Sequence, residues 1–182
     1  MRKIEAYQLS TNEYKELFKS LYKLLCLFAN TYIQNMDASK DIVQNVFIKI
    51  WEDKVEFKNK KAVKSYLYTA VKNKSLDYLK SKNYTSTEYL SLVKMEQLES
   101  NSFFMREVVV LEASAIIEKA IDTLPNRCAQ IIRLSAKNFS NDEIAKKLGI
   151  SINTVKSQKK TAYRRLKPIL KGHFTLIALL FI

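Results

Sequence analysis

Residues 140–166 read SNDEIAKKLGISINTVKSQKKTAYRRL and predict two helices joined by a tight turn. Ser140 begins a capping box of the form S-x-x-E at the start of the first helix. Gly149 ends that helix, because a residue without Cβ adopts the left-handed conformation of a helix C-terminus at little cost. Ala145 is small where the helices cross, and Val155 is apolar where the second helix docks. This pattern predicts a helix-turn-helix, a motif that binds duplex DNA.

The second helix of this motif carries an outward row of hydrogen-bonding and basic side chains. Such side chains neutralise phosphates and reach base edges when a helix lies in a major groove. The residues predicted to bind duplex DNA are Ser151, Asn153, Thr154, Lys156, Ser157, Lys159, Lys160 and Arg164. Taken alone, these residues also fit a helical hairpin with a solvated basic face.

The composition predicts an all-α protein. The 182 residues include two glycines and two prolines, too few for the turns of an all-β chain, and 47% of them are hydrophobic. Helical spacing of apolar residues marks further helices over residues 12–33, 113–122 and 125–137. A chain of this length holds one medium domain or two small ones. We expect two small helical domains joined by a linker, with the helix-turn-helix in the C-terminal domain.

Charge divides the chain into three parts. Residues 1–80 carry 15 basic and 9 acidic side chains, residues 81–112 carry 3 and 5, and residues 113–182 carry 13 and 4. Two basic blocks therefore flank a mildly acidic segment, which loses helical regularity at first and regains it from about residue 92. This pattern predicts two modules that contact polyanions, joined by a linker. The alternative is ordinary lysine-rich solubility.

Residues 37–51 predict a helix that begins at Asp37 and carries two kinds of side chain. An apolar stripe recurs at helical spacing and ends at Trp51, while Asp41 and Gln44 lie on the other side. A helix packed in a core explains the stripe by itself. A polar face between large apolar side chains is also suited to docking a partner protein.

Residues 65–81 predict a helix that follows a basic loop over residues 57–64. Tyrosines alternate with lysines and an asparagine on its polar side. This mixture suits single-stranded nucleic acid, because bases stack on aromatic rings while the backbone lies near positive charge. The alternative is a helix with solvated lysines and tyrosines at its rim.

Several observations exclude other chemistry. Cys26 and Cys128 have no partner motif and His173 is the one histidine, so we expect no metal and no cofactor. The carboxylates are scattered, which predicts no catalytic residue and no small-molecule substrate. The N-terminus lacks a signal-peptide core, which predicts a cytoplasmic protein with reduced thiols. The apolar residues 174–182 are too few to span a bilayer and are expected to pack on the C-terminal domain or to contact a partner or membrane surface.

Three motifs, in this order along the chain, resemble the extracytoplasmic-function (ECF) group of bacterial RNA polymerase sigma factors. Residues 38–51, ASKDIVQNVFIKIW, match the region 2 signature at Asp41, Gln44, Phe47 and Trp51, with Lys40 in place of the usual acid. Residues 66–77, YLYTAVKNKSLD, match the next signature at Tyr66, Leu67, Tyr68, Asn73, Leu76 and Asp77. The C-terminal signature is matched at Leu124, Pro125, Glu143, Ile144, Ala145, Leu148, Gly149, Ser151, Thr154, Val155, Lys156, Ala162 and Leu166, while Gln158 and Lys159 depart from it.

The resemblance implies a sigma factor that directs the RNA polymerase core, through its β′ and β subunits, to promoter DNA. Residues 1–81 then form the domain that binds the β′ clamp, through Asp41, Gln44, Phe47 and Trp51. The same domain captures melted promoter bases, with Phe57, Lys58, Lys60, Lys61, Tyr66, Tyr68, Asn73, Asp77 and Lys80 as the expected contacts. Residues 82–112 form a linker that threads the RNA exit path, residues 113–171 read the upstream promoter element, and residues 172–182 form an apolar tail of unknown role.

The resemblance also implies control by an anti-sigma factor. A rival interpretation is a conventional helix-turn-helix regulator whose N-terminal half senses a signal or dimerises. The helix-turn-helix fits both interpretations. Residues 41–51 together with residues 66–77 favour the sigma factor, since a plain repressor has no need of them.

Overall fold

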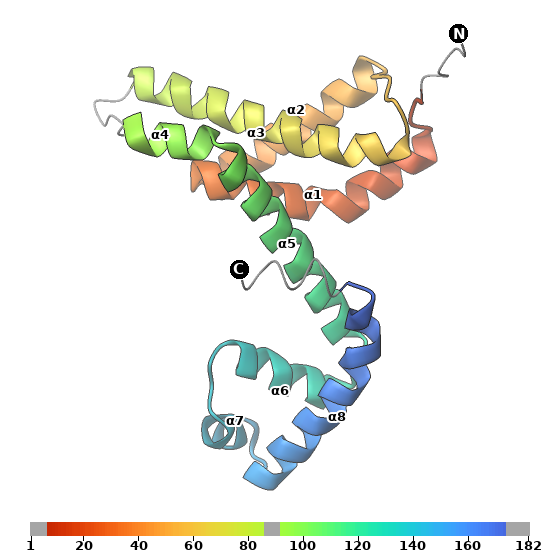
Figure 1. Cartoon of the computed structure of the whole chain (residues 1–182), viewed down its shortest axis with the longest axis vertical. Coiled ribbons are helices and arrows are strands. Elements are labelled where there is room, and N and C mark those ends of the chain that lie inside the picture. The colour runs from red at the N-terminus through yellow and green to blue at the C-terminus, as the bar shows by residue number, and fades with distance from the viewer. Residues whose placement is uncertain (1–6, 86–91, 174–182) are drawn as a thin grey trace. The chain divides into compact units, whose positions relative to one another are not determined.

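The computed structural model describes residues 7–85 and 92–173, which form helices and, apart from one bridge between Tyr7 and Phe57, no β-structure (Figure 1). The helices are α1 (Thr11–Ile33), α2 (Met36–Glu52), α3 (Lys60–Thr85), α4 (Leu92–Glu99), α5 (Asn101–Asp122), α6 (Asn126–Ala136), α7 (Asn141–Leu148) and α8 (Ile152–Lys171). The predicted all-α class is confirmed. The chain divides into two compact units, Met1–Leu111 (unit 1) and Glu112–Ile182 (unit 2), so the boundary falls within α5.

In unit 1, α1 packs against both α2 and α3 and is capped at both ends. The Ser10 side chain accepts a hydrogen bond from the N–H of Glu13, and the Glu13 carboxylate accepts one from the N–H of Ser10, which closes a capping box. Gln34 ends the helix in the left-handed conformation, with φ of 54°. The buried side of α1 consists of Leu21, Leu25, Cys26, Phe28, Ala29 and Tyr32.

The start of α2 is set by an asparagine. The side-chain oxygen of Asn35 accepts a hydrogen bond from the N–H of Ala38 at 3.0 Å, so Asn35 is the N-cap. The predicted cap, Asp37, is wrong by two residues. Asp37 lies in the first turn instead, where its negative charge is favourable at the positive end of the helix.

Another asparagine makes α3 begin at Lys60, five residues earlier than predicted. The Asn59 side chain accepts a hydrogen bond from the N–H of Ala62 at 3.0 Å, which satisfies a free donor of the first turn. Lys60 and Lys61 therefore lie in that first turn, whereas the sequence analysis placed them in a loop. The loop itself is short and passes through Lys54 with φ of 45°.

Residues 92–111 belong to unit 1 and pack on α1 and α3, although a linker was predicted over residues 82–112. Leu98 is 7% exposed and belongs to the unit 1 core. Phe103 contacts the ring of Tyr32 edge-on, with 5.1 Å between centroids. The segment is acidic in composition, but its apolar side chains pack against the unit 1 core.

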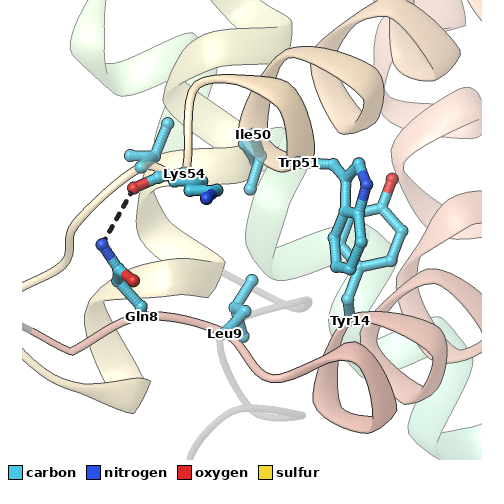
Figure 2. Close-up of a pocket in the computed structure, with 7 residues that line it drawn as sticks. Gln8, Leu9, Tyr14, Ile50, Trp51 and Lys54 are labelled. Atoms are coloured by element: carbon cyan, nitrogen blue, oxygen red, sulfur yellow. Dashed lines mark hydrogen bonds between the residues drawn. The ribbon is translucent and has the colours of Figure 1, made fainter.

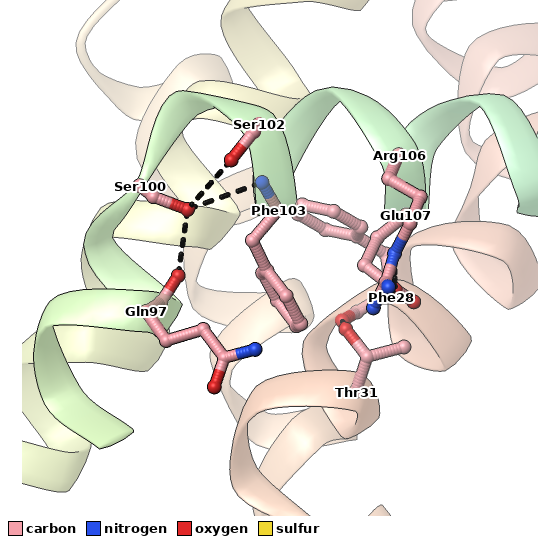
Figure 3. Close-up of polar contacts among 8 residues, drawn as sticks. All are labelled: Phe28, Thr31, Gln97, Ser100, Ser102, Phe103, Arg106 and Glu107. Atoms are coloured by element: carbon pink, nitrogen blue, oxygen red, sulfur yellow. Dashed lines mark hydrogen bonds and ion pairs between the residues drawn. The ribbon is translucent and has the colours of Figure 1, made fainter. Parts of the chain in front are cut away.

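The junction between α4 and α5 is a cap rather than a flexible joint (Figure 3). The Ser100 hydroxyl donates a hydrogen bond to the carbonyl of Gln97 at 2.7 Å and accepts one from the N–H of Phe103 at 3.2 Å. Beyond the cap, the Phe104 ring lies 5.8 Å from the ring of Phe28, between centroids. This cap positions the phenylalanines that hold α5 on unit 1.

Unit 2 has two small apolar clusters in place of one large core. One cluster consists of Ala120, Ile121, Leu124, Cys128, Ala129, Ile132, Ala162 and Leu166, and it joins α5 and α6 to α8. The other consists of Ile131, Ile144, Ala145 and Val155, and it joins α6 and α7 to α8. Most of these side chains are small or aliphatic, so the helices approach one another closely.

The predicted helix-turn-helix is present as α7 and α8. The capping box at Ser140 is closed, and Gly149 ends α7 in the left-handed conformation with φ of 63°. Ser151 caps α8 by accepting a hydrogen bond from the N–H of Thr154 at 3.0 Å. Val155 is fully buried, as its docking role requires.

Two further expectations concern thiols and membranes. Cys26 and Cys128 are buried and free. No helix within residues 7–85 and 92–173 is both long enough and apolar enough to cross a bilayer. The apolar residues 174–182 lie outside the described residues.

Candidate protein and nucleic-acid interfaces

Four side chains at helical spacing form an exposed row on α2, the α2 outer face: Asp41, Gln44, Ile48 and Trp51. Ile48 and Trp51 are each 48% exposed. The Trp51 ring lies against Tyr14, with 5.0 Å between centroids, and the Gln44 amide donates a hydrogen bond to the Tyr22 hydroxyl at 3.2 Å. Tyrosines of α1 thus hold two members of the row, which leaves a partly apolar surface rimmed by an acid and an amide.

Phe47 does not belong to this surface, although the region 2 signature placed it among the polymerase contacts. Its side chain is 1% exposed and packs edge-on against Tyr14 and Phe18, at centroid distances of 5.9 and 5.0 Å. The Tyr14 hydroxyl also donates a hydrogen bond to the Phe47 carbonyl at 3.0 Å. Phe47 therefore supports the α2 outer face from below. Ile48 is the surface residue that the sequence analysis missed, and its i+4 spacing from Gln44 is the signal that could have found it.

The α2 outer face ends at a cavity of about 290 Å³ between the N-terminal segment and the end of α2 (Figure 2). Leu9, Tyr14, Ile50, Trp51 and Val55 form its apolar walls, with Gln8 and Lys54 at the rim. The Gln8 amide donates a hydrogen bond to the Lys54 carbonyl at 3.4 Å. One wall of the cavity is thus the same Trp51 that closes the exposed row.

A groove of about 390 Å³ between α2 and α3 collects polar side chains from both helices. From α3 it includes Tyr66, Asn73 and Asp77, which the sequence analysis predicted as contacts for melted promoter DNA. From α2 it adds Asn45 and Lys49, which the sequence analysis did not predict. Tyr66 is 39% exposed, so part of its ring is available for stacking. We call this feature the α2–α3 groove.

Two aromatic residues predicted to contact melted bases are buried. Tyr68 is 2% exposed and packs edge-on against Phe28, with 5.1 Å between centroids. Phe57 is 6% exposed and lies edge-on to Tyr66 at 5.3 Å. The prediction of direct base contact is wrong for both rings as the unit is folded, because a tyrosine or phenylalanine on the inner side of a helix or loop gains more from the core than from solvent.

The predicted basic contacts of unit 1 differ in their surroundings. Lys58 and Lys61 are exposed. Lys60 pairs with Glu13 at 3.1 Å, and Lys80 pairs with Glu99 at 2.9 Å. Hydrogen bonds from Tyr7, Ser10 and Lys60 lower the pKa of Glu13 to about 2, while Glu13 raises the pKa of Lys60 and Glu99 raises that of Lys80.

In unit 2, one stripe of α8 faces away from both apolar clusters. It consists of Asn153, Lys156, Ser157, Lys160 and Arg164, all exposed and spaced by three or four residues. Three other predicted DNA contacts have local partners: Ser151 caps α8, Thr154 exchanges a hydrogen bond with the Ser151 hydroxyl at 2.8 Å, and Lys159 donates one to Asn141 at 2.8 Å. Within the stripe the Ser157 hydroxyl donates to the Thr154 carbonyl at 3.0 Å, while Lys156, Lys160 and Arg164 present exposed positive charge.

Comparisons with known proteins agree with this arrangement. The family model described as sigma-70 region 2 matches residues 17–84, and the model described as sigma-70, region 4 matches residues 114–166. The chain is 23% identical over 159 residues to "RNA polymerase sigma factor SigZ" of Bacillus subtilis, covering 87% of each protein. It is 28% identical over 80 residues to a "Probable RNA polymerase sigma factor" of Haemophilus influenzae, covering 44% of this chain and 39% of that one.

A solved structure also resembles the chain. It is the co-crystal structure of the sigma factor RpoE with the anti-sigma factor NepR from Bartonella quintana, with 20% identity and a TM-score of 0.35. The match covers 88% of this chain and 98% of that one. The two region models lie on the two helical units, one on α1–α3 and one on the segment from α5 to α8. The chain therefore carries region 2 and region 4 of the sigma-70 RNA polymerase sigma factors, a family that binds core polymerase and promoter DNA to initiate transcription.

Proposed function

We propose that the two units divide promoter recognition between them. Unit 1 binds the β′ clamp of polymerase through the α2 outer face and holds melted promoter bases in the α2–α3 groove. Unit 2 binds the upstream promoter element as duplex through the exposed stripe of α8. The observation that carries the proposal is the α2–α3 groove, which gathers Tyr66, Asn73 and Asp77 beside a row of side chains suited to docking a protein.

The α2 outer face suits a protein partner because an apolar pair of exposed side chains lies next to a polar pair along it. Ile48 and Trp51 offer apolar area that becomes buried on docking, while Asp41 and Gln44 offer hydrogen bonds at its edge. Replacing Gln44 and Ile48 together by alanine is expected to abolish co-purification with core polymerase. Leu27→Ala is the matched control, since Leu27 is an exposed aliphatic residue of α1 outside the row. Unchanged co-purification of the double variant would contradict this assignment.

The α2–α3 groove suits unpaired bases because it joins a partly exposed ring to amide and charged groups. Stacking on an aromatic side chain contributes about 1–3 kcal/mol per base. Unstacking a base from the duplex costs a few kcal/mol, so stacking and hydrogen bonds together offset melting without nucleotide hydrolysis. Tyr66 supplies the stack, and Asn73 supplies a donor and an acceptor that can read a base edge.

Asn73→Ala tests the groove. Permanganate footprinting of the promoter should show reduced reactivity of unpaired thymines, while binding of core polymerase stays intact. Asn101→Ala is the control, because Asn101 is an exposed asparagine of unit 1 outside the groove. An unchanged footprint in the Asn73 variant would remove the groove from the mechanism.

The position of residues 92–111 bears on the predicted path of the linker. A segment that threads the RNA exit path cannot at the same time keep Leu98 and Phe103 on unit 1. We therefore infer that residues 92–111 detach from α1 and α3 when the holoenzyme forms. Cysteines placed to cross-link α4 to α3 should block holoenzyme assembly until they are reduced.

Control and location complete the proposal. The protein acts in the cytoplasm, where polymerase and chromosome are found. An anti-sigma factor is expected to cover the α2 outer face, since the exposed Ile48 and Trp51 suit either partner. Core polymerase should then displace such a factor from the wild-type protein, and the Gln44 and Ile48 variant should bind neither.

A further inference from the structure

The N-terminal segment pairs with the loop that precedes α3. The N–H of Tyr7 donates a hydrogen bond to the Phe57 carbonyl at 2.8 Å, and the N–H of Phe57 donates one to the Tyr7 carbonyl at 2.8 Å. The Gln8 amide donates to the carbonyl of Lys54 in the same loop (Figure 2). The two backbone hydrogen bonds between Tyr7 and Phe57 fix the position of this loop relative to the start of α1.

The Tyr7 side chain is held independently of its backbone. Its hydroxyl donates a hydrogen bond to Glu13 Oε1 at 2.6 Å, and Lys60 Nζ reaches the same oxygen at 3.1 Å. Ser10 donates to the other carboxylate oxygen from its hydroxyl at 2.8 Å. Glu13 therefore ties three segments together: the N-terminal segment, the first turn of α1 and the first turn of α3.

The restraint continues from the loop into the α2–α3 groove. Phe57 is 6% exposed, and its ring meets the Tyr66 ring edge-on at 5.3 Å with 82° between the planes. An edge-on contact limits where the Tyr66 ring can lie, because aromatic pairs prefer this geometry and the loop leaves Phe57 little freedom. Tyr66 is the partly exposed aromatic wall of the groove.

We infer that Tyr7 and Glu13 are positioning residues for promoter opening, which hold Phe57 in place and thereby fix the Tyr66 ring at the angle that receives a melted base. This inference rests on the function proposed for the groove. Neither residue lines the groove, so each acts through Phe57. A purely structural role for the same contacts predicts a loss of stability without a specific loss of opening.

The test uses the full chain in holoenzyme with a promoter fragment. Tyr7→Phe removes the bond to Glu13, Tyr7→Pro removes the N–H that pairs with Phe57, and Glu13→Gln weakens the tie while a capping box remains possible. Each is expected to lower the equilibrium extent of opening, measured by permanganate reactivity at saturating holoenzyme, by up to about tenfold, the lower range of losing one base stack. Affinity for core polymerase should stay unchanged. Glu16→Gln is the charge-matched control, because Glu16 is an exposed carboxylate one turn further along α1.

A double-mutant cycle with Tyr66→Ala separates positioning from stability. Positioning through Tyr66 predicts that Tyr7→Phe and Glu13→Gln cause no further loss of opening once the ring is gone. Additive losses, or normal opening in both variants, would overturn the inference. If Tyr66→Ala and Asn73→Ala themselves leave opening intact, the proposed function of the groove fails first. If they impair opening and the Tyr7 and Glu13 variants do not, only the positioning inference fails.

Discussion

Unit 1 and unit 2 both carry basic side chains that are predicted to contact DNA, but unit 1 pairs two of its predicted contacts with carboxylates. Lys60 is held by Glu13 and Lys80 by Glu99. Each of these lysines must exchange a carboxylate for a phosphate before it can contribute to DNA binding. The basic surface of unit 1 is therefore partly masked, and its masking groups lie on α1 and α4.

Unit 2 shows the opposite arrangement. Helix α8 contains no acidic residue, and within the described part of the chain no carboxylate pairs with Lys156, Lys160 or Arg164. These cations release counterions when they meet phosphates, which is the main source of affinity for duplex DNA. If the two units divide promoter recognition as proposed, the duplex-binding surface of unit 2 is preformed, whereas the opening surface of unit 1 must first release Lys60 and Lys80 from their carboxylates.

The cores of the two units also differ, in the kind of side chain that fills them. Unit 1 is held by edge-on aromatic contacts that connect α1, α2 and α5, whereas unit 2 relies on two small clusters that are largely aliphatic. Aromatic side chains bury more area each, so single truncations in unit 1 should be more damaging. The largest expected effect follows from this difference.

Phe47→Ala should destabilise unit 1 by about 3–5 kcal/mol, because the side chain is 1% exposed and its removal leaves a cavity between α1 and α2. Hydrogen exchange should show loss of protection in α1–α3 and unchanged protection in α6–α8. The neighbouring Ile48→Ala serves as control and should stay within about 0.5 kcal/mol of the wild type. Equal stability of the two variants would mean that Phe47 does not support α2 as described.

The same pair of residues shows how far sequence reasoning reaches. The existence and the helical period of α2 follow from its apolar stripe. The stripe does not reveal that α2 packs against two helices, α1 and α3, so its buried arc is wide enough to include Phe47. Ile48 then falls outside the buried arc. As a result, Phe47 of the region 2 signature is buried and its neighbour Ile48 is exposed.

Boundaries set by polar side chains were the hardest to predict. Asn35 and Asn59 each cap a helix through one hydrogen bond, and several nearby side chains could have done so equally well. The helix-turn-helix, by contrast, was predicted in detail, because its capping box, glycine and apolar positions are all local in sequence. The α2–α3 groove depends on packing between segments that are distant in sequence. For that reason its lining residues Asn45 and Lys49 could not be predicted from local patterns.

A second prediction addresses the unmasked cations of α8. Replacing Lys156 and Lys160 by alanine should lower the slope of log K against log salt by about 2 for upstream-element duplex, since each phosphate contact contributes about 0.9. Lys167→Ala with Lys171→Ala is the matched control at the far end of the same helix, and its slope should remain near that of the wild type. Equal slopes for both double variants would show that the stripe has no special role.

The smallest expected effect concerns the masked cations of unit 1. Glu99→Gln removes the partner of Lys80 but leaves the carbonyl of residue 99, which accepts a hydrogen bond from Lys72 at 3.0 Å. The thermal midpoint should hardly change, because exposed ion pairs contribute little to stability. Binding of holoenzyme to a promoter with a pre-melted bubble should become more salt-dependent, with a slope steeper by up to about 0.7 for one added single-strand phosphate contact.

The control for this variant is Glu96→Gln. Glu96 is an exposed residue of the same helix, α4, so its replacement removes an equal charge without freeing Lys80. A general gain in positive charge would steepen both slopes alike. Release of a masked lysine steepens only that of Glu99→Gln. Since the masking group lies on α4, a positive result would also connect DNA binding by unit 1 to the departure of residues 92–111 from its surface. The availability of Lys80 for DNA would then depend on where residues 92–111 lie, and not on the lysine alone.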